Sequence, residues 1–282
     1  MNNIIKFAVI VLTVLSLSRL AFAGVPLNNL EGVGGIAFNP LAYPAGVPFE
    51  TTDKEKNDPL AVKNIFSKPQ FGGWYVNLGK AKIDWTSVGL AETFFKRLEL
   101  SYGHETVAIA KVDTKHLNNF GAKLLLLPEN SFDTKFIPAI SVGTIAKQTT
   151  KIGPGTDDHG EDFYAVATKL IPQLPRPVLL SGGVLSTQSY VTGVLGYDKK
   201  RDTTGFANID ILPTSNLAVG FEYKQGPEFK TFKNANYWDA HVAWFANKDL
   251  SLVLAYVNTG NRKSSTKTGF ADGVVLSTQY QF

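Results

Sequence analysis

The side chains best suited to chemistry in this sequence are charged residues that recur on one face of extended segments. In residues 217–224, Glu222 and Lys224 lie opposite Val219, Phe221 and Tyr223. Such a set could select solutes by charge, or it could pair with itself and fill a narrow interior. The same alternation in other segments predicts the full inward-facing set: Arg97, Glu99, Lys169, Glu222, Lys224, Asp239 and His241.

An acidic cluster at 157–162 could offer carboxylate oxygens to Ca²⁺. Its spacing and its glycine do not match an EF-hand loop, so a solvated loop is the favoured interpretation. The chain has no cysteine, which excludes disulfides, thiolate metal sites and a cysteine nucleophile. We predict no metal site and no cofactor, and the weak metal candidates are Asp157, Asp158, Glu161 and Asp162.

Histidine is the other side chain here that could act in catalysis. His104, His116 and His159 fall on predicted loops, whereas His241 falls on a predicted strand and faces inward. A lipid-modifying enzyme would need a nucleophile and a base within hydrogen-bond reach on the lipid-facing side, and no motif supports one. The sequence therefore predicts that the chain is not an enzyme.

A long series of alternating segments positions these side chains. In residues 250–258, Leu250, Leu252 and Leu254 share one face, opposite Ser251. Alternation with a period of two marks strands of a sheet with two unlike faces. Twelve strands are predicted, at 72–82, 87–94, 97–103, 120–127, 136–146, 162–171, 178–187, 204–212, 216–224, 236–246, 250–258 and 273–282.

The predicted connections alternate in length. Short periplasmic turns and longer extracellular loops are typical of outer-membrane barrels. Aromatic residues near the strand ends, among them Trp74, Trp85, Tyr164 and Tyr237, are interpreted as a girdle at the membrane interface. The short connections are 95–96, 128–135, 172–177, 213–216 and 246–249; the long polar ones are 104–119, 147–161, 188–203, 225–235 and 259–272, with 83–86 a short exception on their side.

Residues 1–23 have the parts of a cleavable secretory signal. They combine the basic Lys6, a short apolar run and the small-x-small site at 21–23. No later stretch reaches 18 uninterrupted apolar residues, so no transmembrane helix is predicted. The segment also carries Arg19, so part of the net charge of +4 belongs to it, and nothing in the remaining charge demands a nucleic-acid partner.

The rest of the chain divides into two predicted parts. Residues 24–70 form an irregular segment, rich in glycine and proline before a charged stretch at 51–57. This segment could plug the lumen, lie in the periplasm or add a pair of strands, and we prefer the lumen or its periplasmic mouth. Residues 71–282 form the barrel, and its last strand ends with Tyr280 and Phe282, which resemble the C-terminal insertion signal of outer-membrane barrels.

Several segments together resemble one bacterial outer-membrane family, known as a domain of unknown function (number 3034). The resemblance covers most of the chain after the signal and implies an outer-membrane location, but it supplies no activity and no catalytic residues. The segments that carry it are 31–35, 97–102, 162–169, 217–224, 237–248 and 250–256.

The sequence thus predicts an all-β protein, a transmembrane antiparallel up-and-down barrel of about twelve strands in the outer membrane of a Gram-negative bacterium, with both termini periplasmic. The first hypothesis for its function is a narrow passive pore for small polar solutes. The second is a plugged barrel that scaffolds an export or surface complex, and the third is a lipid-facing barrel enzyme. The expected partners are outer-membrane lipid, lipopolysaccharide and, during biogenesis, the barrel-insertion machinery.

Overall fold

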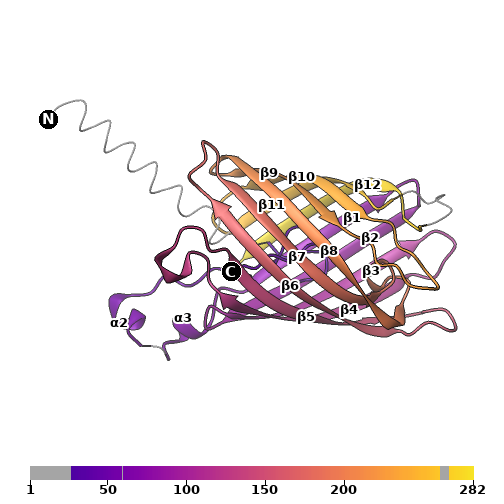
Figure 1. Cartoon of the computed structure of the whole chain (residues 1–282), viewed down its shortest axis with the longest axis horizontal. Coiled ribbons are helices and arrows are strands. Elements are labelled where there is room, and N and C mark those ends of the chain that lie inside the picture. Colours follow the sequence, from indigo (N-terminus) through magenta and orange to yellow (C-terminus); the bar gives the residue numbers. More distant parts are fainter. Residues whose placement is uncertain (1–26, 59, 261–266) are drawn as a thin grey trace.

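Twelve antiparallel strands close into one barrel in the computed structural model, which describes residues 27–58, 60–260 and 267–282 (Figure 1). Strands that follow each other in the chain pair with each other, and β1 pairs with β12, so the sheet has no free edge. The strands are β1 (Gln70–Leu78), β2 (Ile83–Phe94), β3 (Leu98–Ile109), β4 (Lys115–Leu127), β5 (Ala139–Thr149), β6 (His159–Ile171), β7 (Val178–Ser189), β8 (Tyr197–Thr214), β9 (Leu217–Lys224), β10 (Tyr237–Phe245), β11 (Leu250–Asn258) and β12 (Asp272–Gln281).

The two ends of the barrel differ, and we name them by their position. Gln70 and Gln281 are cross-strand partners at one end, the near end. The turn between β1 and β2, residues 79–82, lies at the opposite end, the far end. Connections at the near end are mostly short, whereas the far end carries the longer ones at 150–158, 225–236 and 259–271.

The outer surface of the wall is apolar and the inner surface carries most of the polar side chains. Along β12, Leu276 and Tyr280 point outward, while Ser277 and Gln279 point inward and are buried. Because hydrocarbon offers no hydrogen-bond partners, a closed barrel with an apolar outside is one of the two architectures that can span a bilayer. Further exposed apolar side chains on the outside are Leu90, Leu100, Phe120, Val142, Phe163, Val184, Ile209, Phe221, Val242 and Leu254.

The number of strands agrees with the prediction, but at the far end of the barrel the predicted strand boundaries differ from the observed ones. β3 continues to Ile109 and β4 begins at Lys115, so most of the predicted loop 104–119 is strand. The predicted connection 83–86 lies inside β2. His104 and His116 are therefore strand residues, and His159 is the first residue of β6. The hydrogen-bonded ladder does not need apolar side chains and extends beyond the region where they alternate.

The aromatic girdle was predicted with too many members. Trp74, Trp85, Tyr164 and Tyr237 point into the barrel, where each is at most 6% exposed. Other aromatics, such as Trp244, do lie on the outside. Proximity to a strand end does not decide which way a ring points, because the alternation along the strand does.

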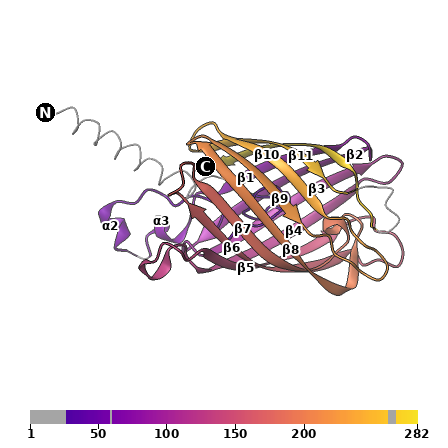
Figure 2. The same cartoon turned by 45° about the horizontal axis from the view of Figure 1, so that its top comes forward.

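Residues 27–46, which we call the plug, lie inside the barrel. Most of them are buried, and they pack against inward-facing residues of the wall. The chain then leaves through the near end, and short helices α2 (Asp53–Lys56) and α3 (Val62–Ile65) lie beyond that end in both views (Figures 1 and 2). Two 3-10 turns, η1 (Ser131–Asp133) and η2 (Val191–Gly193), complete the elements. No helix in the described residues is long and apolar enough to cross a membrane.

Candidate functional site

The plug rests on a row of glycines in the barrel wall. Gly72, Gly89 and Gly103 are cross-strand neighbours on β1, β2 and β3. A Cβ atom at Gly89 would stand 2.9 Å from Gly32 Cα, and one at Gly103 would stand 2.7 Å from the carbonyl carbon of Glu31. Gly32 itself has a φ of 88°, which favours glycine. The main chain of the plug thus approaches the wall more closely than side chains would permit.

The carboxylate of Glu222 on β9 holds three successive amides of the plug. Ala37 N and Phe38 N donate to Oε2 at 3.0 and 3.1 Å, and Asn39 N donates to Oε1 at 3.3 Å. Lys224, two residues along the same strand, donates to Phe38 O at 3.4 Å. Successive amides directed at one anion form a nest, so this part of the plug is built to receive a carboxylate.

Glu99 on β3 and Lys123 on β4 form a second clamp. Glu99 accepts from Gly34 N at 2.8 Å and from Ala45 N at 2.6 Å. Lys123 Nζ lies 2.7 Å from Glu99 Oε2 and donates to Gly34 O at 2.9 Å. Both side chains are almost completely buried, so the clamp satisfies a charge pair that has no contact with bulk water.

A third cluster surrounds Lys147 on β5. Its ammonium group lies 2.6 Å from Asp162 Oδ2 and is also paired with Glu31, the one acidic residue of the plug. Glu105 on β3 is fully buried and accepts from Trp85 Nε1 at 2.8 Å. The plug therefore meets the wall through a charged side chain at this point as well as through its main chain.

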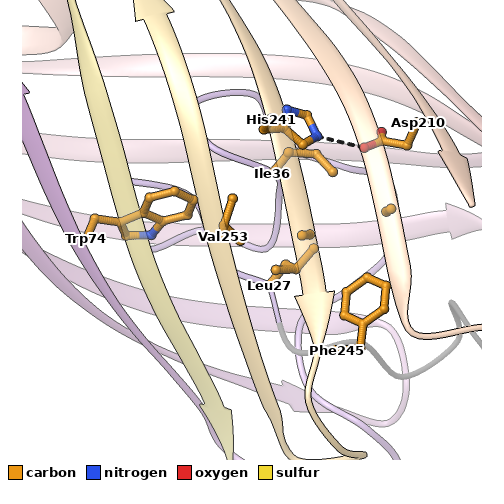
Figure 3. Close-up of a pocket in the computed structure, with 9 residues that line it drawn as sticks. Leu27, Ile36, Trp74, Asp210, His241, Phe245 and Val253 are labelled. Carbon is orange, nitrogen blue, oxygen red and sulfur yellow. Dashed lines mark hydrogen bonds and ion pairs between the residues drawn. The ribbon is translucent and has the colours of Figure 1, made fainter.

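His241 on β10 lies between two aspartates. Its Nδ1 is 2.7 Å from Asp239 Oδ1. Its Nε2 is 2.8 Å from Asp210 Oδ1, the contact that Figure 3 shows. Asp239 is also the cross-strand partner of Glu222, so this group continues the Glu222 site along the wall. Ile36 of the plug lines the same small void as His241 and Asp210.

At the near end, Tyr43 ties the plug to the connection between β4 and β5. The Tyr43 hydroxyl donates to Glu129 Oε2 at 2.8 Å, and Glu129 Oε1 pairs with Lys169 Nζ at 3.1 Å. Burial first, and then the Glu129 carboxylate, raise the pKa of Tyr43 above its usual value. The hydroxyl therefore remains a donor over the accessible pH range.

The far end is closed by apolar packing. The segment between β7 and β8 turns inward, and Val191 and Val194 are buried with Val107, Leu117 and other wall residues. The ring of Tyr190 packs against Phe229 at a centroid distance of 5.1 Å. Val191 and Thr192 both have positive φ values, a strained conformation for β-branched residues.

Little space remains inside the barrel. One void of about 10 Å³ lies beside His241 at the near half, and another of about 60 Å³ lies in the apolar far half. A void needs about 10–15 Å³ of this kind of volume to hold one water molecule. With the plug in place, the described residues leave no lumen like the aqueous channel of a large porin.

Two of the predicted inward-facing residues lie elsewhere. Arg97 is exposed in the turn before β3, where it donates to the carbonyls of Leu125 and Leu126. Lys169 falls on the outward parity of β6 and reaches the near-end rim to pair with Glu129. Long basic side chains reach polar partners at a strand end, so the alternation does not decide their position there. The structure places the others, Glu99, Glu222, Lys224, Asp239 and His241, in the lumen.

The acidic cluster at 157–162 does not act as a unit. Asp162 points inward to Lys147, Glu161 points outward to Arg201, and Asp158 pairs with His159. Among the described residues, no group of three or more histidine, aspartate or glutamate side chains is arranged to hold a metal ion.

The two aromatic residues at the end of β12 lie on the outside of the near end. Tyr280 and Phe282 are 42% and 63% exposed, and their rings pack edge to face at 5.3 Å. Phe282 N donates to Pro69 O, which joins the last residue to the start of β1.

Five charged wall residues of the site were not identified from the sequence as lumen-facing: Glu105, Lys123, Lys147, Asp162 and Asp210. The predicted strands ended at 103 and 146, so Glu105 and Lys147 were assigned to loops. Lys123 lies beside Leu124 to Leu127, where the alternation is hidden because the inward-facing Leu125 packs against the plug. Extending the strands by their parity would have found Glu105 and Lys147, whereas Asp162 and Asp210 already lay within predicted strands.

Comparisons with known proteins agree with this architecture. A family model with the description "Protein of unknown function (DUF3034)" matches residues 60–279. A search of the curated proteins finds no match. Among solved structures, the chain is similar to "KdgM porin", with a TM-score of 0.53 at 10% identity over 76% of this chain and 99% of that one.

Two other solved structures extend the comparison. "KdgM porin in complex with disordered oligogalacturonate" is similar with a TM-score of 0.52 at 9% identity, over 76% of this chain and 99% of that one. "Outer membrane phospholipase A from Escherichia coli" is similar with a TM-score of 0.43 at 10% identity, over 76% and 96%. The two porin structures, at about 10% identity, establish the fold of an outer-membrane barrel and no activity.

Proposed function

The chain belongs to the family described as "Protein of unknown function (DUF3034)", and we propose that it is an outer-membrane channel whose resting state is closed by its own plug. The observation that carries the proposal is the chemistry of the inner wall. Glu99, Lys123 and Glu222 are ionisable groups, yet the plug satisfies them mainly through its main chain.

A permanent filler would not require this chemistry. Burying charged groups costs free energy, and well-packed apolar residues of similar volume are often at least as stable. If the plug leaves, water enters, and the charged wall is then suited to the hydrated state. The charged wall therefore suits two states, one in which the plug occupies the lumen and one in which water does.

The near end faces the periplasm in this proposal, because the short turns gather there. Residues 1–23, which lie outside the described residues, would direct export and be removed. The apolar outside of the wall then contacts outer-membrane lipid, with lipopolysaccharide around the far end.

Single-channel recording in planar bilayers tests the proposal. We expect the full chain to be closed for most of the time, and a variant lacking residues 27–46 to show steady open steps. A full-length Gly103→Ala variant, in which the new Cβ would overlap the main chain of Glu31 and Gly32, provides a second route to the same state if the deletion does not fold. Folded variants that give no open steps would contradict the channel.

The second candidate is a plugged scaffold, and the filled lumen favours it. In that case residues 47–69 with α2 and α3, which lie outside the near end, would hold a partner. The recordings separate the two candidates, because a scaffold keeps its lumen closed even when the plug contacts are broken.

The lipid-facing enzyme has weaker support. On the outside of the wall, His116 Nδ1 lies 3.2 Å from Thr106 Oγ1, which is a base and a hydroxyl within reach. The nearby Asn118 bonds to His104 and Tyr102, so it does not orient His116 as the third member of a triad would. Assays with phospholipid vesicles and a His116→Ala control would test this candidate directly.

A further inference from the structure

The wall recognises the plug mainly through its peptide groups. Eight plug amides donate to wall side chains, at residues 28, 34, 37, 38, 39, 42, 45 and 46. Six plug carbonyls accept from wall side chains, at residues 28, 30, 34, 38, 42 and 45. The acceptors and donors come from strands on every side of the barrel, so they form a lining for a peptide main chain.

The polar side chains of the plug have fewer hydrogen-bond partners in the wall than its peptide groups have. Both side-chain polar atoms of Asn28 are buried without a partner, as are Asn29 Nδ2 and Asn39 Oδ1, among the described residues. Three side chains do make specific contacts: Glu31 with Lys147, Asn39 Nδ2 with two strand carbonyls, and Tyr43 with Glu129. Hydrogen bonding therefore depends more on the peptide backbone than on the plug sequence.

The shape of the wall points in the same direction. Gly89 and Gly103 leave room for the main chain of the plug, while Gly72 and Gly121 leave room for the plug side chains of Asn28 and Val33. A free ion would use only the wall groups of opposite charge. A turned peptide with small side chains would use the wall acceptors through its amides and the wall donors through its carbonyls, since each residue other than proline carries one donor and one acceptor.

We infer that the lumen is a binding site for short peptides that fold back on themselves in turns, as the plug does, and that are rich in small apolar residues. The plug is its resident occupant. The inference rests on the proposed function, because a second peptide can bind only where the plug leaves. It names the class of substrate, since a peptide that replaces the plug takes over the same clamps at Glu99, Lys123 and Glu222.

The test begins with the folded full chain. A site-specific protease sequence is inserted after Leu60, which is 74% exposed outside the near end, and the purified protein is cut there. A fluorescent synthetic peptide of residues 27–46 is then added, and its uptake is followed by anisotropy. We expect uptake that the unlabelled peptide competes away.

Modified peptides decide whether the main chain is what the lumen recognises. Methylation of the Ala37 and Ala45 amides removes donors to Glu222 and Glu99. Because each such bond to a charged group contributes about 1.5–3 kcal/mol, binding should weaken by at least about 100-fold. Methylation of the Tyr43 amide, which makes no hydrogen bond in the described residues, is the matched control. A peptide with Asn39 replaced by alanine loses two hydrogen bonds to uncharged strand carbonyls and should lose less than the doubly methylated one.

The outcomes separate this inference from the channel itself. No uptake of the labelled peptide by the cut protein overturns the inference, and so does equal binding of the doubly methylated and control peptides. Bilayer recordings of the same cut protein report on the channel independently. Open steps without peptide binding would support the channel and reject the peptide site. Peptide binding without open steps would support the peptide site and reject the channel.

Discussion

The two halves of the lumen are closed by different chemistry. In the near half, the plug makes hydrogen bonds with charged wall residues such as Glu99 and Lys123, beside apolar packing by plug residues such as Leu27. In the far half, Val191 and Val194 pack with Leu117 and with Leu30 of the plug in an apolar cluster. The near closure thus includes polar contacts that water can replace, while the far closure is mainly apolar.

This difference predicts that the two halves of the lumen open in response to different changes. Removing the plug exposes its apolar contacts, but water that reaches the near half hydrates the wall charges and offsets part of that cost. Opening the far half exposes apolar surface, but it also relieves the strained backbone of Val191 and Thr192, which costs on the order of 1–3 kcal/mol per residue. We expect the near half to respond to polar changes and the far half to respond to changes in packing.

The largest effect is expected from Glu99→Gln. The change leaves the buried ammonium of Lys123 without its carboxylate partner, which costs about 3–5 kcal/mol when one member of a buried pair is removed. Guanidinium unfolding in lipid vesicles should show this loss, and bilayer recordings should show more frequent opening. The control is Glu228→Gln at the exposed far-end connection, which should leave both readouts almost unchanged. Equal effects of the two variants would show that the Glu99–Lys123 pair does not hold the plug.

Leu117→Ala should act mainly on the far half, although its cluster also contains Leu30 and Ala37 of the plug. Leu117 is completely buried in the apolar cluster, and truncating a buried leucine costs about 2–5 kcal/mol. The free energy of unfolding should fall by this amount, while the frequency of plug release should rise less than in Glu99→Gln. Frequent long openings in this variant would mean that the far half, rather than the plug, controls the channel.

Gly103→Ala should act on the plug with a smaller change in overall stability. Overpacking a site of this kind costs typically about 1–3 kcal/mol, and the clash falls on the plug main chain. The open fraction in bilayer recordings should rise roughly tenfold or more. Gly73→Ala is the matched control, because a Cβ there would meet nothing closer than Thr278 O at 3.8 Å. The glycine row has no role if the two variants behave alike.

The smallest effect is expected from Tyr43→Phe. The variant removes one hydrogen bond to Glu129 at the near-end mouth and keeps the ring. Glu129 keeps its ion pair with Lys169, so a loss near the lower end of the range for a bond to a charged group, about 1.5 kcal/mol, is expected. Thermal unfolding of the variant beside the parent protein measures it, and a loss as large as that of Glu99→Gln would show that the mouth, not the clamp, holds the plug.

The sequence was sufficient to predict the barrel wall, but it did not reveal how the plug is bound inside the lumen. Alternation with a period of two placed Leu276 outside and was enough to put Glu222 and His241 on the inner face. It failed for Arg97, because this residue lies in the turn before β3, where a long side chain finds its partner by reach. Lys169 was assigned to the wrong face, since it follows the inward-facing Thr168 on β6.

No pattern in the sequence reveals the contacts between the plug and the wall. Glu222 binds peptide amides, and every residue except proline has one, so the sequence of residues 37–39 does not reveal the bond. Similarly, Glu105 and Lys147 were missed because polar strand residues beyond the membrane resemble loop residues. Contacts between side chains and main chain must be seen in three dimensions.

Thiol labelling of the full chain tests the central claim most directly. The protein has no cysteine of its own, so Ala42→Cys reports on the plug, and Leu60→Cys, outside the barrel, reports on free access. With a small charged thiol reagent, Ala42→Cys should react far more slowly than Leu60→Cys, and adding Gly103→Ala should bring its rate close to that of the exposed site. Equal rates at both positions in the otherwise unchanged protein would contradict a lumen closed by its own plug.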